Sequence, residues 1–206
     1  MELNELRSEI VEFGASLFAR GFTAGSSGNI SVRCGNNFVM TPTNSSLGRL
    51  QEERLSILNQ DWEHIAGDKP SKEVVMHRAM YRARPELGAI VHLHSAYVTA
   101  LSCLVPPEGP LMTPYTPYFV MKMGVDLPLI PYFKPGDPAM EEVIFQAAKK
   151  SKVLVLSNHG SLVGAASLVN AVDTAEELEV SAQLSLLLHG QNTRPLSHQE
   201  ISELLG

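Results

Sequence analysis

Cysteine is scarce in this sequence, which has only Cys34 and Cys103 among its 206 residues. Two cysteines are too few for a disulfide framework or a thiolate metal cluster. The opening residues, Met-Glu-Leu-Asn-Glu-Leu-Arg, also lack the basic start and apolar core of a signal peptide. We therefore expect a reducing, cytoplasmic setting.

Positive charge and long apolar runs are lacking as well. The chain has 16 Lys and Arg against 22 Asp and Glu, a formal net charge of −6. The basic residues form no run that could follow a phosphate backbone, which argues against a nucleic-acid partner. No stretch approaches about 18 uncharged apolar residues, which argues against a membrane-spanning helix.

What the sequence does contain is typical of a folded globular protein. Apolar residues make up 44% and charged residues 18%, and the length suits one domain, residues 1–206. Helical spacing of apolar residues and short apolar runs alternate along the chain, which predicts an α/β sandwich. The predicted helices cover residues 3–20, 71–84, 95–103, 119–124, about 138–150 and 168–188, and the predicted strands 30–33, 38–41, 55–58, 89–94, 129–132, 152–157 and 161–164.

The pair His92-Leu93-His94 lies in a predicted strand. Residues two apart on a strand point to the same face, so both imidazoles can reach one metal ion, and imidazole suits zinc and other first-row divalent metals. The alternative is one histidine hydrogen bonded in the core and the other at the strand end. His159, which follows another apolar strand, is the candidate third ligand, although alone it would be read as a turn residue. The remaining histidines are interpreted as ordinary surface residues: His64, His77, His189 and His198.

Glu73 lies in the first turn of the predicted helix 71–84, with Ser71 at its N-cap and an apolar stripe formed by Val74, Val75, Ala79 and Met80. A carboxylate there is often only a favourable partner of the helix dipole. However, free backbone N–H groups and small donors also make a helix N-terminus an anion site. Two further segments rich in small donors, 28–29 and 41–46, favour a phosphate site, whereas read alone they would be turns.

Five motifs in this order and spacing resemble the class II aldolase/adducin family over nearly the whole chain. They are Gly28-Asn29-Ile30-Ser31-x-Arg33, Met40-Thr41-Pro42-Thr43, Lys69-Pro70-Ser71-x-Glu73, His92-x-His94 and Asn158-His159-Gly160. The resemblance implies a three-layer α/β/α sandwich around a central mixed, largely antiparallel sheet. It also implies a homotetramer with active sites at subunit interfaces.

The resemblance further implies the role of individual residues. One Zn²⁺ per subunit would be bound by His92, His94 and His159. Glu73 would act as the acid/base and would ligate the metal when substrate is absent. The residues expected at the substrate phosphate are Asn29, Thr43, Asn44, Ser71 and Lys72.

This sequence departs from the related sugar-phosphate aldolases at two of these positions. They tend to have glycine where this chain has Asn44 and serine where it has Lys72. Family members also bring a tyrosine from the neighbouring subunit to the site. Tyr118 is the best match, because it lies just before the predicted helix 119–124, and Tyr115 is the alternative.

Within the family, segments 116–124 and 129–138 look most like the 3-oxo-tetronate 4-phosphate decarboxylases. This resemblance implies metal-dependent decarboxylation of a small phosphorylated sugar acid to dihydroxyacetone phosphate and CO₂ through a metal-stabilised enediolate. An aldolase of the fuculose or ribulose phosphate type is the first alternative, because aldol cleavage uses the same enediolate, and a pentulose-phosphate 4-epimerase is the next. A non-enzymatic, adducin-like interaction module is disfavoured because the three histidines and Glu73 are all retained.

Overall fold

The computed structural model, which describes residues 2–206, has an eight-stranded central sheet in the order β4-β3-β2-β1-β5-β8-β7-β6. Neighbouring strands run antiparallel except β6 and β7, which are parallel. The predicted mixed, largely antiparallel sheet is therefore confirmed. The strands are β1 (Asn29–Cys34), β2 (Asn37–Met40), β3 (Ser56–Leu58), β4 (His64–Ala66), β5 (Ala89–Leu93), β6 (Leu129–Ile130), β7 (Val153–Leu156) and β8 (Gly160–Ala165).

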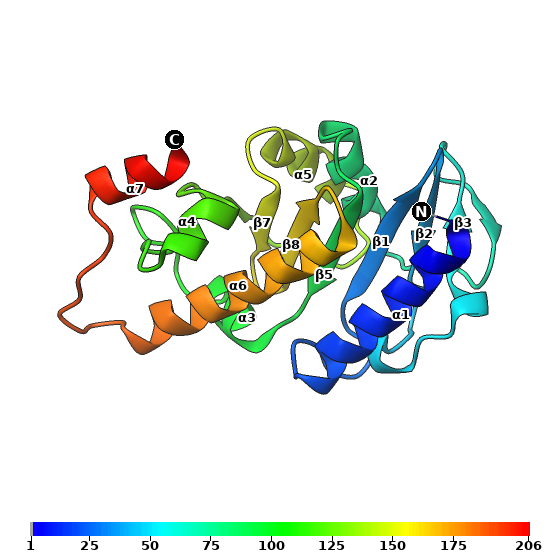
Figure 1. The fold of residues 1–206 in the computed structure, drawn as a ribbon, viewed down its shortest axis with the longest axis horizontal. Coiled ribbons are helices and arrows are strands. Elements are labelled where there is room, and N and C mark those ends of the chain that lie inside the picture. Colours follow the sequence, from blue (N-terminus) through cyan, green and yellow to red (C-terminus); the bar gives the residue numbers. More distant parts are fainter. Residues whose placement is uncertain (1) are drawn as a thin grey trace.

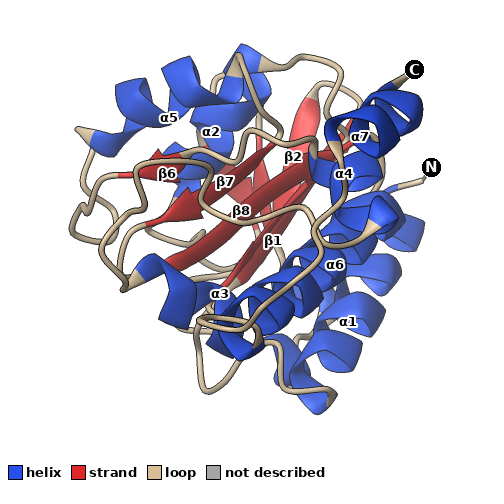
Figure 2. Ribbon diagram, turned by 90° about the vertical axis from the view of Figure 1, so that its left-hand side faces the viewer, coloured by secondary structure: helices blue, strands red, loops and turns tan. Residues whose placement is uncertain are grey.

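Helices cover both faces of this sheet, as Figures 1 and 2 show, and so complete the predicted three layers. One face carries α2 (Val74–Ala83) and α5 (Met140–Ala148). The other carries α1 (Leu3–Ala19), α3 (Ala96–Ser102), α4 (Pro117–Met123) and α6 (Leu168–Leu187). The last helix, α7 (His198–Leu205), packs against α4.

The alternation of side chains in β5 decides which layer receives the site. Ala89, Val91 and Leu93 are buried in the core beneath α1 and α6, whereas Ile90 is buried in the core beneath α2 and α5. Because successive residues of a strand point to opposite faces, His92 lies on the same face as Ile90, toward α2. The packing of the two apolar cores thus fixes the face of the sheet on which the His92 side chain lies.

Most predicted elements are present, and the differences concern their ends and their buried faces. Helix α2 begins at Val74 rather than at Ser71, because residues 71–73 form a separate turn in which Val74 N donates to Ser71 O over 3.1 Å. The face of α2 that packs on the sheet also differs from the predicted stripe, since Val74 and Val75 are only half-buried. Its buried residues are Met76, His77, Ala79, Met80 and Tyr81.

One strand and one α-helix of the structure were not predicted from the sequence. Strand β4 has exposed side chains throughout and pairs only with β3, at the sheet edge, so it lacks the apolar signal of a buried strand. Helix α7 has no buried residue. Among residues 2–206, no helix is both long and apolar enough to cross a membrane.

Candidate active site

Three histidines and one glutamate converge at the end of β5. His92 lies in β5, His94 directly follows this strand, His159 lies between β7 and β8, and Glu73 immediately precedes α2. The donor atoms of the four side chains all lie within 4.8 Å of one another. The three imidazole rings meet edge to face, with centroids 4.6 to 4.9 Å apart. The structure thus brings together the four residues expected from the sequence at a metal.

The hydrogen bonds around these rings leave nitrogen lone pairs for a cation. His92 Nδ1 donates to the Ser161 carbonyl oxygen over 2.7 Å, which makes Nε2 the unprotonated nitrogen of the neutral ring. This Nε2 lies 2.9 Å from His94 Nε2. His159 Nε2 is buried and lacks a well-formed hydrogen bond, although Glu73 Oε1 lies 3.1 Å away. A metal ion among the donors would satisfy this buried nitrogen, and the bond to Ser161 is the backbone support typical of a metal-binding histidine.

The charges of the cluster also suit a divalent cation. Burial lowers the pKa of His92 to about 3, despite the opposing influence of Glu73. Burial, followed by the proximity of His159, lowers the pKa of His94. Burial would raise the pKa of Glu73, but the proximity of His92 and His159 and the hydrogen bond from Asn29 outweigh it, and this pKa is lowered. Imidazole nitrogens and one carboxylate form a donor set that fits zinc and related metals.

Gly160 allows the His159 turn to approach β5. At its φ of +155°, a Cβ atom would lie 2.1 Å from the Leu93 carbonyl oxygen and 3.2 Å from the Cα of His94. Any side chain here would therefore push the turn away from the strand end. The Asn158-His159-Gly160 sequence thus places the third histidine beside the other two.

Glu73 belongs to a row of buried polar residues between α2 and β1, here called the polar seam. The row consists of Asn29, Ser31, Glu73, His77 and Tyr81. Glu73, His77 and Tyr81 are four residues apart, the spacing of one helix face, and Asn29 and Ser31 are two apart on β1. Asn29 Nδ2 donates to Glu73 Oε2 over 2.8 Å, and His77 Nε2 lies 2.6 Å from Asn29 Oδ1.

The interpretation of His77 as a surface residue is wrong, because its side chain is fully buried. The prediction failed because it assumed the wrong inward face of α2. A polar residue at four-residue spacing between Glu73 and Tyr81 was the available signal. Burial lowers the pKa of His77 to about 4, partly offset by Glu73, so the ring is neutral.

A cavity of about 160 Å³ opens beside this cluster. It brings together all five residues expected at a phosphate, together with Glu73 and His94. The sequence did not single out three further lining residues, Ser26, Ser27 and Pro135; the only signal for the serines was the Gly- and Ser-rich composition before β1. The lining is Ser26, Ser27, Gly28, Asn29, Pro42, Thr43, Asn44, Ser71, Lys72, Glu73, His94 and Pro135.

Asn44 and Lys72 are the two positions at which this chain differs from the related sugar-phosphate aldolases. Asn44 has a φ of +56°, the left-handed conformation that glycine adopts freely and that asparagine tolerates better than most residues. The loop therefore keeps a conformation that glycine would also adopt. Ser71 is buried, with Oγ accepting a hydrogen bond from Glu73 N over 3.2 Å, whereas Lys72 is exposed.

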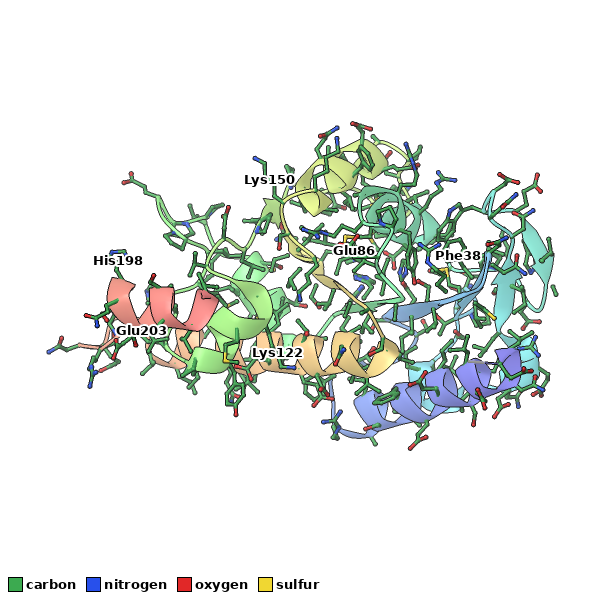
Figure 3. The ribbon with its side chains drawn as sticks, turned by 45° about the horizontal axis from the view of Figure 1, so that its top comes forward. Phe38, Glu86, Lys122, Lys150, His198 and Glu203 are labelled. Carbon is green, nitrogen blue, oxygen red and sulfur yellow. The ribbon has the colours of Figure 1, made fainter. Side chains whose placement is uncertain are left out.

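The structure does not bring either tyrosine to the cavity within one chain. Tyr118 lies on α4, 63% exposed, beside a shallow surface formed with α6. Lys122, one turn further along α4, lies 3.8 Å from Asp173 Oδ2 on α6, and Figure 3 shows it beside that helix. Tyr115 is partly buried, with its hydroxyl 3.2 Å from Thr193 Oγ1. Tyr118 is thus the more exposed of the two.

Sequence comparison shows which known proteins this chain is similar to. Residues 8–186 match the family model of the class II aldolase and adducin N-terminal domain. A 3-oxo-tetronate 4-phosphate decarboxylase of Haemophilus influenzae is 48% identical over 95% of this chain and 93% of its own. An L-fuculose phosphate aldolase of Escherichia coli is 32% identical over 100% of this chain and 94% of its own.

Solved structures agree with this relationship. The crystal structure of YgbL from Klebsiella pneumoniae superposes with a TM-score of 0.95 at 45% identity, covering 99% of both chains. An L-fuculose 1-phosphate aldolase superposes with a TM-score of 0.86 at 27% identity, covering 97% of this chain and 94% of its own. The chain belongs to the class II aldolase/adducin family.

Proposed function

We propose that the protein is a metal-dependent carboxy-lyase that converts a 3-oxo-tetronate 4-phosphate to dihydroxyacetone phosphate and CO₂. The observation that carries this proposal is the convergence of three histidines and Glu73 beside a cavity lined by small polar donors. Five relatives named as 3-oxo-tetronate 4-phosphate decarboxylases are 40–48% identical to the chain, against 32–34% for three named as L-fuculose phosphate aldolases. This difference favours decarboxylation over aldol cleavage.

The metal we propose is zinc, one ion per subunit, held by His92, His94 and His159, with Glu73 as a further ligand when substrate is absent. Three imidazole ligands with a position left for substrate is a common catalytic zinc arrangement. A bound divalent cation supplies Lewis-acid polarisation of the substrate ketone and stabilises the negative charge that develops as CO₂ leaves. The backbone acceptor at His92 keeps that ring in the tautomer required for ligation.

The phosphate group is assigned to the polar wall of the cavity. Ser71 and the backbone at the start of the α2 turn supply donors, and Thr43, Asn44 and Lys72 lie on the same wall. One amide hydrogen of Asn29 is engaged by Glu73. We assign the second hydrogen of this amide to the phosphate, so that Asn29 would contact both the acid/base residue and the substrate.

Glu73 is assigned to proton transfer. Loss of CO₂ from the β-keto acid leaves an enediolate, and delivery of a proton to C2 gives dihydroxyacetone phosphate. In the structure the pKa of Glu73 is lowered, so this carboxylate must gain proton affinity on substrate binding. The negative charges of the substrate carboxylate and phosphate act in that direction.

Tyr118 is assigned to the site of a neighbouring subunit in a cytoplasmic homotetramer. Its exposure, together with that of Met121 and Val180 on the same α4 and α6 surface, supports a covered interface there.

Refolding a mixture of the inactive variants Tyr118→Phe and Glu73→Gln should then restore activity in hybrid sites. If the mixture stays as inactive as its parents, Tyr118 does not act between subunits.

The donor cluster and the adjoining cavity take residues from β1, the turn before α2, β5 and the turn before β8, which are far apart in the sequence. This supports a single functional domain for residues 1–206. An adducin-like interaction role without catalysis gives no physical reason to gather four donor groups around a cavity.

A substrate panel tests the proposed reaction. The zinc-loaded protein is incubated separately with 3-oxo-tetronate 4-phosphates and with L-fuculose 1-phosphate, and consumption is followed by ³¹P NMR. We expect consumption of a 3-oxo-tetronate 4-phosphate and little reaction with the ketose phosphate. Exclusive consumption of L-fuculose 1-phosphate would establish the aldolase instead.

A further inference from the structure

His77 occupies a position for which neither metal ligation nor phosphate binding gives a reason. It is fully buried, it lies outside the donor cluster, and it does not line the cavity. Burying a polar ring is unfavourable unless its hydrogen-bonding groups are satisfied. The partners of its two ring nitrogens therefore indicate what the residue does.

The direction of each hydrogen bond follows from Glu73. An ionised carboxylate only accepts hydrogen bonds, so Asn29 must present its NH₂ group to Glu73 Oε2, which it does over 2.8 Å. Asn29 Oδ1 then faces His77 Nε2 at 2.6 Å. Because an amide oxygen can only accept, the proton of the neutral His77 ring must be on Nε2.

The other side of the ring is consistent with the same tautomer. His77 Nδ1 lies 2.7 Å from Ser31 Oγ, which can donate its hydroxyl hydrogen to an unprotonated nitrogen. Tyr81 lies beyond and donates its hydroxyl hydrogen to the Ser31 carbonyl oxygen over 3.1 Å. The Tyr81 oxygen, 3.2 Å from Ser31 Oγ, is the more distant of the two acceptors open to the Ser31 hydroxyl hydrogen. Both nitrogens of the ring are thus satisfied inside the protein.

We propose that His77 is a positioning residue, whose Nε2–H fixes the amide of Asn29 so that Asn29 Nδ2 points at Glu73 and holds its carboxylate for proton transfer. A rotation of the Asn29 amide by 180° would place an oxygen against a carboxylate oxygen, and the Nε2–H group prevents this rotation. His77 therefore acts through Asn29, without touching substrate or metal. The effect on proton transfer rests on the proposed function, whereas the tautomer and the amide orientation do not.

The first test needs neither metal nor substrate. In metal-free protein labelled with ¹⁵N-histidine, long-range ¹H–¹⁵N spectra report the tautomer of each neutral ring. We expect His77 as the Nε2–H tautomer at neutral pH, with no conversion to another form down to about pH 5. An Nδ1–H tautomer or a protonated ring would overturn the proposal, whatever reaction the enzyme catalyses.

The second test compares two substitutions. Gln is expected to place an amide nitrogen near the former Nε2 and so keep the donor to Asn29, whereas Leu removes it. For His77→Leu we expect kcat to fall about 10- to 100-fold, the loss typical of a hydrogen bond that supports a charged group. Metal content should stay near the wild-type value, KM should rise by a smaller factor than kcat falls because Asn29 is also assigned to the phosphate, and His77→Gln should recover most of the lost kcat. His64→Leu, at an exposed histidine on β4, is the matched control.

The outcomes separate the alternatives. A folded His77→Leu protein with unchanged kcat contradicts the proposal, as does an equal kcat loss in the Leu and Gln variants with normal metal content. If the Leu variant does not fold, the His77→Gln kinetics and the tautomer spectra of the wild-type protein decide. If the wild-type protein does not decarboxylate, the proposed function fails, and the spectra still judge the orientation of Asn29.

Discussion

The side-chain amide of Asn29 donates to Glu73 Oε2 over 2.8 Å, and Asn29 is paired across the sheet with His92. The proposed acid/base residue is therefore tied to the strand next to the one that carries a proposed metal ligand. Glu73 Oε2 itself lies 3.4 Å from His92 Nε2. This arrangement connects the proposed metal-binding and proton-transfer groups through β1 and β5, the two central strands of the sheet.

Replacing Glu73 by glutamine should separate chemistry from metal binding. The Glu73→Gln side chain keeps the shape and an acceptor for Asn29 but cannot exchange a proton. We expect kcat to fall about 10²- to 10⁴-fold, the usual contribution of a general acid/base. Metal content, measured by mass spectrometry, should remain near one ion per subunit, and a variant with more than half of the wild-type kcat would exclude Glu73 as the acid/base.

Replacing His94 by alanine should abolish metal binding and activity together. His94 is the half-buried member of the histidine cluster, so its removal disturbs the packed core less than removal of His92 would. We therefore expect the His94→Ala protein to retain its circular dichroism spectrum while losing its metal. Full metal occupancy in this variant would show that His94 is not a ligand.

Lys72 should contribute to phosphate binding rather than to catalysis. Its side chain is exposed at the cavity. Because Lys72→Gln would remove a charge-assisted contact to the phosphate, we expect KM to rise about 5- to 20-fold with kcat nearly unchanged. Lys150→Gln, just beyond α5 (Figure 3), is the control with the same charge change. An unchanged KM for Lys72→Gln would remove this residue from the phosphate site.

The parts of this site that could be predicted are those whose residues lie close together in the sequence. His92 and His94 share a strand face by local geometry alone. The apolar runs at 89–94 and 152–157 predicted the strand that carries this pair and the strand that precedes His159. The polar seam was not visible, because Asn29 and His77 meet only when β1 packs against α2, and the inward face of α2 was misjudged. The role proposed for Tyr118 is not visible within one chain, because this residue is not among those that line the cavity beside Glu73.

The buried His77 should also make stability depend on pH. Its pKa is lowered from 6.5 to about 4 by burial, with Glu73 opposing. Its ring nitrogens contact Asn29 and Ser31, and Tyr81 lies beyond Ser31. The unfolded chain binds a proton at this residue near pH 6.5, while the folded chain does not until about pH 4. The free energy of unfolding therefore decreases as pH falls through this window and is unaffected above it.

Comparison with His77→Gln isolates this contribution. Between pH 6.5 and 4 the metal-free wild-type protein should lose up to about 3 kcal/mol more than the variant, which has no titrating ring there. Urea unfolding across this range measures the difference. Parallel curves for the two proteins would show that His77 titrates normally in the folded state.

The most direct test of the account is the carbon balance of the reaction catalysed by the zinc-loaded protein. With a 3-oxo-tetronate 4-phosphate labelled with ¹³C at C1, the label should appear entirely as CO₂, in equal amount with unlabelled dihydroxyacetone phosphate and with no aldehyde product. Retention of the label in a phosphorylated product, or formation of an aldehyde fragment, would contradict decarboxylation at this site.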